Sequence, residues 1–270
     1  MSGSASGGEL ESVPDIPNGA RIYDFMLGGK DNFHADRVAA GAMLAANPAA
    51  GRTARANRGF LGRAVRAAAV EGGIDQFLDI GTGLPTQQNV HEVAQDAAPG
   101  SRTVYVDNDP VVIAHANALL GATDRVGVVE GDVRSPLEIL HHPTTRQLID
   151  FSRPVCVLLV AVLHFVADEQ DPDGIVHTLR EAMAPGSHLI LSHTIDESPT
   201  EITGTATSGF RRAGTPLFPR TRARVETFFD GFDLLEPGLV DVDTWRPTEP
   251  ADPGPPSAWV LAGGMGRLPR

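Results

Sequence analysis

Acidic residues and glycines recur where predicted β-strands end, and they are the first residues that could bind a ligand. Asp79 closes a short apolar run and opens the turn Asp79-Ile80-Gly81-Thr82-Gly83. Glycines in such a turn let the backbone bend tightly and let a ligand approach the main chain without a Cβ in the way. Asp107 closes the next run, where a carboxylate can accept two hydrogen bonds from a ribose diol. These positions favour a ribose-containing ligand.

Two further strand ends extend this pattern. Asp132, in Glu130-Gly131-Asp132-Val133, can accept a hydrogen bond from an adenine amino group, and the small residues of Val160-Ala161-Val162 let a ligand lie along the backbone. Taken singly, each motif has a plainer alternative: a tight turn, a Gly-Asp turn, or a helix N-cap at Asp107, a role that Asp109 before Pro110 also fits. Acids at three successive strand ends form a stronger joint signal, because open α/β sheets bind ligands there.

The elements that must position these residues alternate between β-branched runs and helical segments. Strands are expected at 76–80, 102–106, 125–130, 155–160, 187–192, 232–242 and 258–262, and helices at 86–98, 110–120, 175–183 and 224–229. The all-apolar run 155–160 is typical of a central strand of a parallel sheet. The alternation predicts a doubly wound α/β sheet.

The chain before the first strand differs in character. Residues 1–15 have neither the basic nor the apolar segment of a secretory signal and are predicted to be a disordered tail. Residues 16–73 are predicted to be helical, with a break at Gly28-Gly29 and an amphipathic helix at 51–70. The arginines of that helix favour a solvated face, and an anionic partner is the alternative.

Composition narrows the functional classes. The net charge of -12 argues against a nucleic-acid-binding surface, because phosphate contacts need a basic field. The single cysteine, Cys156, rules out an internal disulfide and fits a reducing cytoplasm. The longest apolar run, 155–167, is too short to cross a bilayer. We expect a cytoplasmic protein that binds neither nucleic acid nor a membrane, and nothing in the sequence indicates its oligomeric state.

The motifs, taken in order, resemble a known family. DIGTG, YVDND, EGDV, LLVAVLHF and MAPGSHLILSH are similar to motifs of class I S-adenosylmethionine-dependent methyltransferases. More narrowly, NGARIYDFMLGGKDNFHADR and ARANRGFLGRAVR resemble an actinobacterial group described as S-adenosyl methyltransferase, formerly a domain of unknown function. The resemblance extends from Ile16 over nearly the whole chain. It implies a helical cap at 16–73 and a Rossmann-like methyltransferase domain at 74–270, with seven strands and the last one antiparallel.

The same resemblance implies S-adenosylmethionine as the cofactor and assigns residues to it. The residues expected around its methionine, ribose and adenine parts are Asp79, Gly81, Thr82, Gly83, Asp107, Asn108, Asp132, Val133, Ala161 and Val162. The N-terminal residues expected to close over the cofactor or the acceptor are Tyr23, Met26, Gly28, Gly29, Asn32 and Phe33. The strand end at 161–164 lacks the Asn/Asp-Pro-Pro-Tyr/Phe motif of many enzymes that methylate amino groups, which disfavours that class.

The expected reaction is methyl transfer to a small-molecule acceptor, with an oxygen atom favoured. Positioning alone supplies much of the rate of such a displacement, and an oxygen acceptor can also need a general base. His164 and His193 follow the fourth and fifth strands and are the candidate catalytic residues, with a purely structural histidine as the alternative for each. The segment 198–224 is expected to shape the acceptor pocket.

Other functions stay open at this point. A non-catalytic module that binds S-adenosylmethionine or its demethylated product is the main alternative, because no catalytic residue is fixed by the sequence. A nicotinamide-dependent dehydrogenase is disfavoured, since Thr86 stands where its third glycine would be. A metal-dependent enzyme would use Asp168, Asp171 and Asp173, which more simply cap the next helix. We therefore predict no metal.

Overall fold

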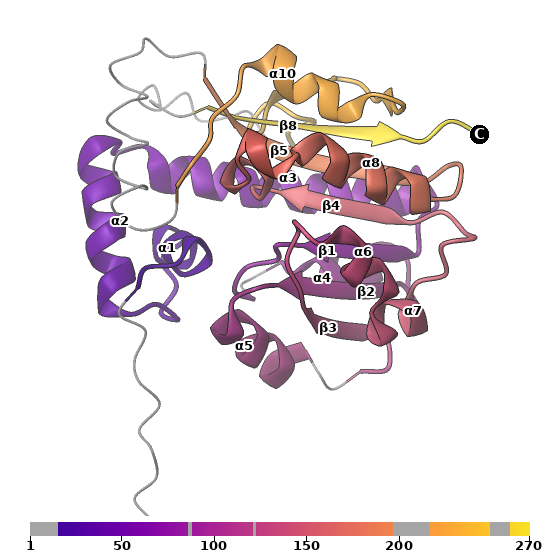
Figure 1. Cartoon of the computed structure of the whole chain (residues 1–270), viewed down its shortest axis with the longest axis horizontal. Coiled ribbons are helices and arrows are strands. Elements are labelled where there is room, and N and C mark those ends of the chain that lie inside the picture. The colour runs from indigo at the N-terminus through magenta and orange to yellow at the C-terminus, as the bar shows by residue number, and fades with distance from the viewer. Residues whose placement is uncertain (1–15, 86–87, 121–122, 197–215, 249–259) are drawn as a thin grey trace, which may run out of the picture.

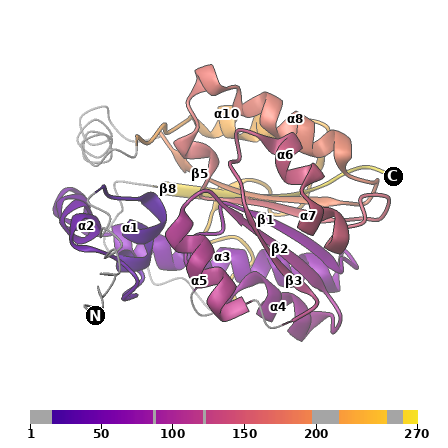
Figure 2. The ribbon, with the colours of Figure 1, turned by 60° about the horizontal axis from the view of Figure 1, so that its bottom comes forward.

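The protein is one central sheet covered by helices on both faces (Figures 1 and 2). The structure, a computed structural model, describes residues 16–85, 88–120, 123–196, 216–248 and 260–270. The predicted tail at 1–15 and residues 198–215 of the predicted acceptor-shaping segment lie outside the described residues. Among the described residues, no helix combines the length and the apolar character needed to cross a membrane.

The sheet has the strand order β3-β2-β1-β4-β5-β8-β6, with β7 also paired to β8. The strands are β1 (Gln76–Ile80), β2 (Arg102–Asp107), β3 (Val126–Glu130), β4 (Cys156–Val160), β5 (His188–Ile195), β6 (Asp233–Leu234), β7 (Val240–Asp241) and β8 (Val260–Arg267). Strands β1 to β5 run parallel, and β8 runs antiparallel to β5. The predicted Rossmann-like fold with an antiparallel closing strand is therefore confirmed. Strand order reverses between β1 and β4, which places the ligand-binding crevice at their carboxyl ends.

The strand predicted at 232–242 is two short strands instead of one. Both β6 and β7 pair antiparallel with β8, at Leu234 and at Val240 respectively. Between them lie Pro237, which has no N–H to donate to a ladder, and Gly238, whose φ of +89° turns the chain out of the extended conformation. Among the described residues the sheet therefore has eight strands, where seven were expected.

The helices divide between the two faces of the sheet, as Figure 2 shows. They are α1 (Gly19–Met26), α2 (His34–Ala46), α3 (Ala50–Val70), α4 (Val90–Ala97), α5 (Pro110–Leu120), α6 (Pro136–His141), α7 (Pro143–Leu148), α8 (Pro172–Ala182) and α10 (Arg222–Glu226), with 3-10 turns η1 (Leu163–Phe165), η2 (Asp168–Gln170) and η3 (Thr227–Phe229). Side chains of α3, α4 and α5 form the core on one face, and those of α6, α7 and α8 form the core on the other.

Helices α6 and α7 were not predicted from the sequence, although each begins with a proline, a residue favoured at the first position of a helix. The predicted start of α4, at residue 86, was too early. That helix begins at Val90, because the Asn89 N–H donates to the Glu92 carboxylate at 2.8 Å and so fixes the helix start.

Helices α1 and α2 lie at the end of the sheet where the parallel strands finish (Figure 1). Their apolar side chains, with the first turns of α3, form a separate cluster that includes Ile22, Met43 and Leu217. A buried ion pair holds α1 in place: Arg21 donates to Asp36 at 2.9 Å and to Asp109 at 2.6 Å. Asp109 begins the helix after β2, so this pair connects the N-terminal helices to the sheet beside a predicted site residue.

Helix α3 packs along β8, the last strand in the sequence. A Cβ added at Gly263 of β8 would lie 2.7 Å from the Phe60 ring, so a glycine is required at this contact. Arg63 donates to the main-chain carbonyls of Val242 and Trp245 at 2.6 and 2.8 Å. The face of α3 that was expected to be solvated is therefore partly an interface with the C-terminal part of the chain.

Candidate active site

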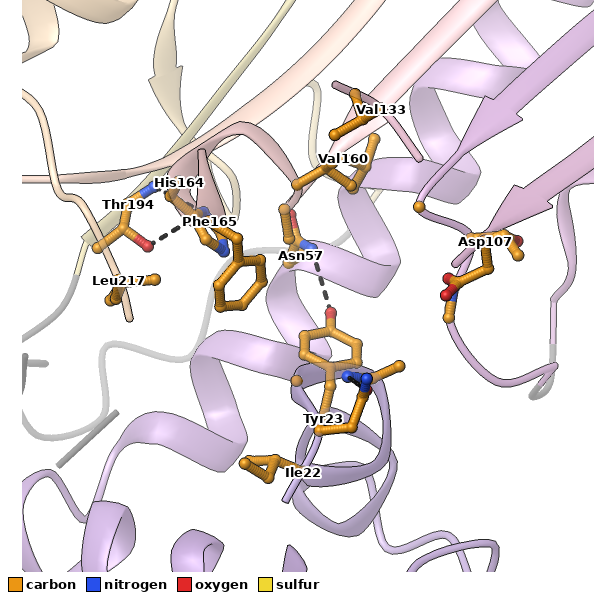
Figure 3. Close-up of a pocket in the computed structure, with 18 of the residues that line it drawn as sticks. Ile22, Tyr23, Asn57, Asp107, Val133, Val160, His164, Phe165, Thr194 and Leu217 are labelled. Carbon is orange, nitrogen blue, oxygen red and sulfur yellow. Dashed lines mark hydrogen bonds between the residues drawn. The ribbon is translucent and has the colours of Figure 1, made fainter. Parts of the chain in front are cut away.

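A pocket of about 440 Å³ lies at the carboxyl ends of β1, β2 and β4, between the strand ends and helices α1 and α3. Its volume is within the range of small-molecule sites, about 300–1,000 Å³. In Figure 3, Asp107 lies on one side of the pocket and His164, Thr194 and Leu217 lie on the other, with Tyr23 between them. The pocket is thus elongated, with two chemically different ends.

The glycine-rich turn after β1 forms part of the pocket wall. A Cβ on Gly81 would lie 2.3 Å from Cγ2 of Val162, and the φ of Gly81 is +72°, so only glycine fits there without displacement. Gly83 has a φ of +66°. The atom nearest to a Cβ added at Gly83 would be the Cβ of Ala20, at 3.9 Å, so the main chain at Gly83 is open to a ligand. The turn therefore presents its backbone to the pocket.

Asp79 is a buried carboxylate near the carboxyl end of β1 and lines the pocket. The Thr82 hydroxyl donates to its Oδ2 at 2.9 Å. Burial raises the pKa of Asp79 to about 6, against the Thr82 hydrogen bond and the charge of Arg58, which lower it, while nearby Asp107 raises it further. Arg58, on α3, also lines the pocket. Arg58 was not predicted as a site residue, because it lies among helical arginines that favour a solvated face.

Asp107 lies at the end of β2 and is also buried. Its Oδ2 accepts from the Gly83 N–H at 2.9 Å, and its Oδ1 accepts from the Asp109 N–H at 3.0 Å. Burial raises the pKa of Asp107 in spite of these hydrogen bonds. Asp109 accepts from the Val111 N–H at 2.8 Å and so caps the following helix. The helix-capping role that was the alternative for Asp107 therefore belongs to Asp109.

The third acid, Asp132, is more exposed than the other two. Arg134 donates to it from Nε at 2.8 Å and also from its terminal nitrogen, and the Asn108 amide donates at 3.3 Å. The Arg134 hydrogen bonds lower the pKa of Asp132 to about 2. Asn108, Asp132 and Val133 all line the pocket. Asp132 is therefore an ionised carboxylate at the rim.

A chain of hydrogen bonds connects the N-terminal helices to the end of β4. The Tyr23 hydroxyl donates to the Ala54 carbonyl at 2.8 Å and accepts from Asn57 Nδ2 at 3.1 Å, as drawn in part in Figure 3. Asn57 Oδ1 accepts from Ser192 Oγ at 2.7 Å, and Ser192 Oγ accepts from the Ala161 N–H at 3.0 Å. Ala161 has a φ of +58°, which is strained for alanine and is thus held by its surroundings.

Tyr23, Asn57 and Ala161 line the pocket. The sequence analysis missed Asn57, although it is a polar residue on the apolar face of α3, one turn before Leu61. Burial raises the pKa of Tyr23. Since its hydroxyl proton is donated to a carbonyl, Tyr23 forms part of the wall and is poorly placed to remove a proton.

His164 lines the pocket in the turn η1 that follows β4. Its Nδ1 accepts from the Thr194 N–H at 3.3 Å and lies 3.3 Å from the Thr194 hydroxyl. In the neutral ring the proton is then on Nε2, which has no hydrogen-bond partner among the described residues. Burial, together with His193 and Arg220, holds the pKa of His164 well below its usual range. The ring is a neutral donor.

His193 does not line the pocket, contrary to its candidacy as a catalytic residue. Its Nε2 accepts from Arg220 at 2.9 Å and its Nδ1 donates to the Thr194 carbonyl at 2.8 Å, so both ring nitrogens are used. Burial lowers its pKa to about 3. Arg220 also donates to the carbonyls of Leu163 and Val166, and this places the turn that holds His164. His193 is therefore a structural histidine.

The N-terminal candidates divide into two groups. Tyr23 and Met26 line the pocket. The candidates that lie outside its lining are Gly28, Gly29, Asn32 and Phe33. They form the turn between α1 and α2: Asn32 donates to Asp24 at 2.9 Å, and the Phe33 ring lies 5.4 Å from the Arg21 guanidinium. These residues shape the turn. A sequence motif looks the same whether its residues build a turn or contact a ligand, so the motif alone could not distinguish the two roles.

The aspartates after β4 are dispersed. Asp171 accepts from the Gly174 N–H at 2.9 Å and caps α8, while Asp168 pairs with Arg220 and Asp173 with Arg224. No group of three or more potential metal-ligating side chains occurs among the residues that the structure describes. Asp171 therefore has the helix-capping role that was the simpler expectation for this segment.

Known proteins place the chain in a family. The sequence profile of a family described as S-adenosyl methyltransferase matches residues 10–269. A proposed methyltransferase from Thermobifida fusca is 42% identical, with a TM-score of 0.90 over 95% of this chain and 96% of that one. A DUF574-family protein from Streptomyces avermitilis is also 42% identical, with a TM-score of 0.91 over 94% and 98%.

More distant structures share only the fold. The N-methyltransferase NodS from Bradyrhizobium japonicum, in complex with S-adenosyl-L-homocysteine, is 13% identical, with a TM-score of 0.50 over 93% of this chain and 100% of that one. No curated protein matches the sequence. The family profile covers nearly the whole chain and agrees with the two structures of highest identity reported above. The chain therefore belongs to the S-adenosyl methyltransferase family and is a methyltransferase that uses S-adenosylmethionine.

Proposed function

We propose that the cofactor lies along the strand ends, with its adenosine part toward Asp107 and Asp132 and its methionine part toward Asp79 and Arg58. The residues fit this group. Asp79 is buried, its pKa is raised to about 6, and its one hydrogen bond from a described residue comes from Thr82. A buried carboxylate so poorly compensated has an unmet demand for a cation, which an amino-acid ammonium group would satisfy.

The other groups along the strand ends suit the remaining parts of the cofactor. Arg58 supplies a positive charge beside Asp79 for a carboxylate. Asp107 has two oxygens with lone pairs left after their main-chain hydrogen bonds, as a ribose diol requires. When bound, S-adenosylmethionine supplies an electrophilic methyl carbon on a positively charged sulfur. The residues of this chain must then hold an acceptor atom in line with that carbon.

We further propose that the acceptor is a small molecule and that an oxygen atom is methylated. The observation that supports this is the far end of the pocket, where His164 Nε2 presents an N–H to a cavity with largely apolar walls. Helices α1 and α3 border this end, and the volume of the whole pocket, about 440 Å³, is that of a small-molecule site. The net charge of -12 opposes a nucleic-acid acceptor.

Methyl-labelled cofactor tests this proposal. The full chain is incubated with labelled S-adenosylmethionine and an actinobacterial cell extract, and the products are separated by size. Label in the small-molecule fraction that resists mild alkali, as an ether does, is the expected result. Label confined to protein or nucleic acid would refute the proposed acceptor class. An Asp107→Ala variant, which should lose cofactor binding, is the negative control for label carried by other enzymes of the extract.

A further inference from the structure

We infer that the acceptor is an uncharged aromatic molecule that presents a phenolic oxygen to His164. The inference rests on the proposed function and names the substrate class of the same pocket. The region concerned, called the acceptor end, is the part of the pocket formed by Ile22, Met26, Met43, Phe165 and Leu217 around His164. Figure 3 shows His164, Phe165 and Leu217 on the side of the pocket away from Asp107.

The charged side chains that the structure describes in the pocket lie at its other end. Among the described lining residues, the charged ones are Arg58, Asp79, Asp107, Asp132 and Arg134, which lie on α3 or at the ends of β1, β2 and β3. No described side chain at the acceptor end can pair with an ammonium or a carboxylate group. A charged acceptor would lose its hydration there without a counter-ion, at a cost of several kcal/mol.

The shape and chemistry of the walls suit a flat ring. Met26 and Met43 place two thioethers in the lining, and sulfur atoms make favourable contacts with aromatic rings. Phe165 presents an aromatic ring, which packs edge-on against His164 with the ring centres 4.5 Å apart. Ala50 and Ala54 are small residues of the first turns of α3 in the lining. A planar apolar ligand can therefore contact an aromatic ring and two sulfur atoms at once.

The protonation state of His164 indicates which kind of acceptor oxygen suits the site. Because Thr194 N–H donates to Nδ1, the ring offers a proton at Nε2 and has no free lone pair to accept one. His164 can hold an oxygen by donating to it, but it is a poor general base. A phenol ionises near pH 10, far more readily than an aliphatic alcohol. In the transfer, the oxygen forms the bond to the methyl carbon, the carbon–sulfur bond breaks with its electron pair left on sulfur, and the hydroxyl proton passes to water.

Binding of model compounds tests the inference without requiring turnover. The full chain is first titrated with S-adenosylhomocysteine by calorimetry and then, when saturated, with 2-naphthol. The charged comparisons are 6-hydroxy-2-naphthoate and 2-naphthylmethylamine, which keep the same ring system. We expect 2-naphthol to bind and both charged compounds to bind at least tenfold more weakly, which corresponds to about 1.4 kcal/mol.

Variants localise the binding. Met43→Gln should weaken 2-naphthol at least threefold with an unchanged dissociation constant for S-adenosylhomocysteine, whereas Val38→Gln, on the exposed side of the same helix, should change neither. His164→Phe should weaken 2-naphthol but not naphthalene, since only the former uses the N–H. A variant that fails to fold would also lose binding of S-adenosylhomocysteine. In that case, the comparison of 2-naphthol with the two charged compounds on the wild-type protein tests the inference.

The outcomes separate the two proposals. If S-adenosylhomocysteine binds but 2-naphthol does not, or if a charged compound binds as tightly as 2-naphthol, the acceptor class is wrong and the proposed cofactor site stands. If S-adenosylhomocysteine itself fails to bind, the proposed function fails and the inference falls with it.

Discussion

Replacing Asp79 by asparagine should stabilise the cofactor-free protein and weaken cofactor binding. The carboxylate is buried, and its pKa is raised to about 6 from an ordinary value of 3.8, mainly by burial. An acid whose pKa is higher in the folded chain resists ionisation there. Asparagine has the shape of the protonated acid and can still accept from Thr82, but it never has to be ionised inside the protein.

The magnitude follows from the two pKa values. Below about pH 4 the acid is protonated in both states and costs nothing. As the pH rises from about 4 to 6, the unfolded chain releases its proton freely while the folded chain retains it, so the wild-type protein loses stability. Above pH 6 the loss levels off at about 3 kcal/mol, which is the free-energy equivalent of the difference between the two pKa values. The gain from Asp79→Asn should therefore approach 3 kcal/mol at pH 8 and vanish near pH 4.

Urea denaturation of the cofactor-free protein at pH 4.5 and pH 8 measures this gain, and calorimetry with S-adenosylhomocysteine measures the loss of binding, expected to be tenfold or more. Asp124→Asn, at an exposed position, is the matched control and should change stability little at either pH. A variant that is less stable than the wild type at pH 8, or whose gain is equal at both pH values, would refute the reasoning.

Further predictions concern the other site residues. Asp107→Asn should weaken S-adenosylhomocysteine roughly 10- to 100-fold in calorimetry, because one amide oxygen must replace a carboxylate that already accepts two main-chain N–H groups. Arg21→Met should lower the free energy of unfolding by about 3–5 kcal/mol in urea, since two buried carboxylates lose their partner. Gly81→Ala should cost at least about 2 kcal/mol and reduce cofactor affinity, through its positive φ and its collision with Val162.

Each of these changes has a control in the chain. Asp132→Asn should affect binding less than Asp107→Asn, because its carboxylate is partly exposed and already held by an arginine. Arg66→Met breaks an exposed ion pair and should cost less than about 1 kcal/mol. Gly28→Ala has a φ of +84° but no atom within 4 Å of its built Cβ, so it isolates the strain from the collision. If a substitution and its control had equal effects, the difference in burial or contact on which the prediction rests would not explain the result.

The acids and glycines at the strand ends could be predicted from the sequence because local patterns specify them. A strand is recognised from its own residues, and the side chain that follows it in a parallel sheet must face the crevice. Asp79, Asp107 and Asp132 needed no knowledge of distant contacts, and they all line one pocket. The alternation of strands and helices that builds the parallel part of the sheet could be predicted for the same reason.

The remaining site residues depend on partners that are far away in the sequence. Asn57 contacts Ser192, 135 residues later, and Arg220 contacts Asp168, 52 residues earlier. Helical periodicity indicates which face of α3 is buried, but it does not indicate which polar atom the face meets. The same limit applies to His193: the sequence predicts it just after a strand, whereas β5 extends to Ile195, and Arg220, which donates to its ring, is 27 residues away in the sequence.

The packing of α3 along β8 has a consequence for how the chain folds. Phe60 lies against Gly263, and the pocket is lined by residues from Asn18 to Leu261, so no short stretch of the sequence contains the site. Such long-range contacts close large loops and slow the search for the native state. During synthesis, the part of the apolar side of α3 that packs against β8, including Phe60, stays uncovered until β8 has left the ribosome. Because Leu261 of β8 lines the pocket, the cofactor site is complete only after that, and we expect the apolar surface exposed before completion to favour chaperone binding.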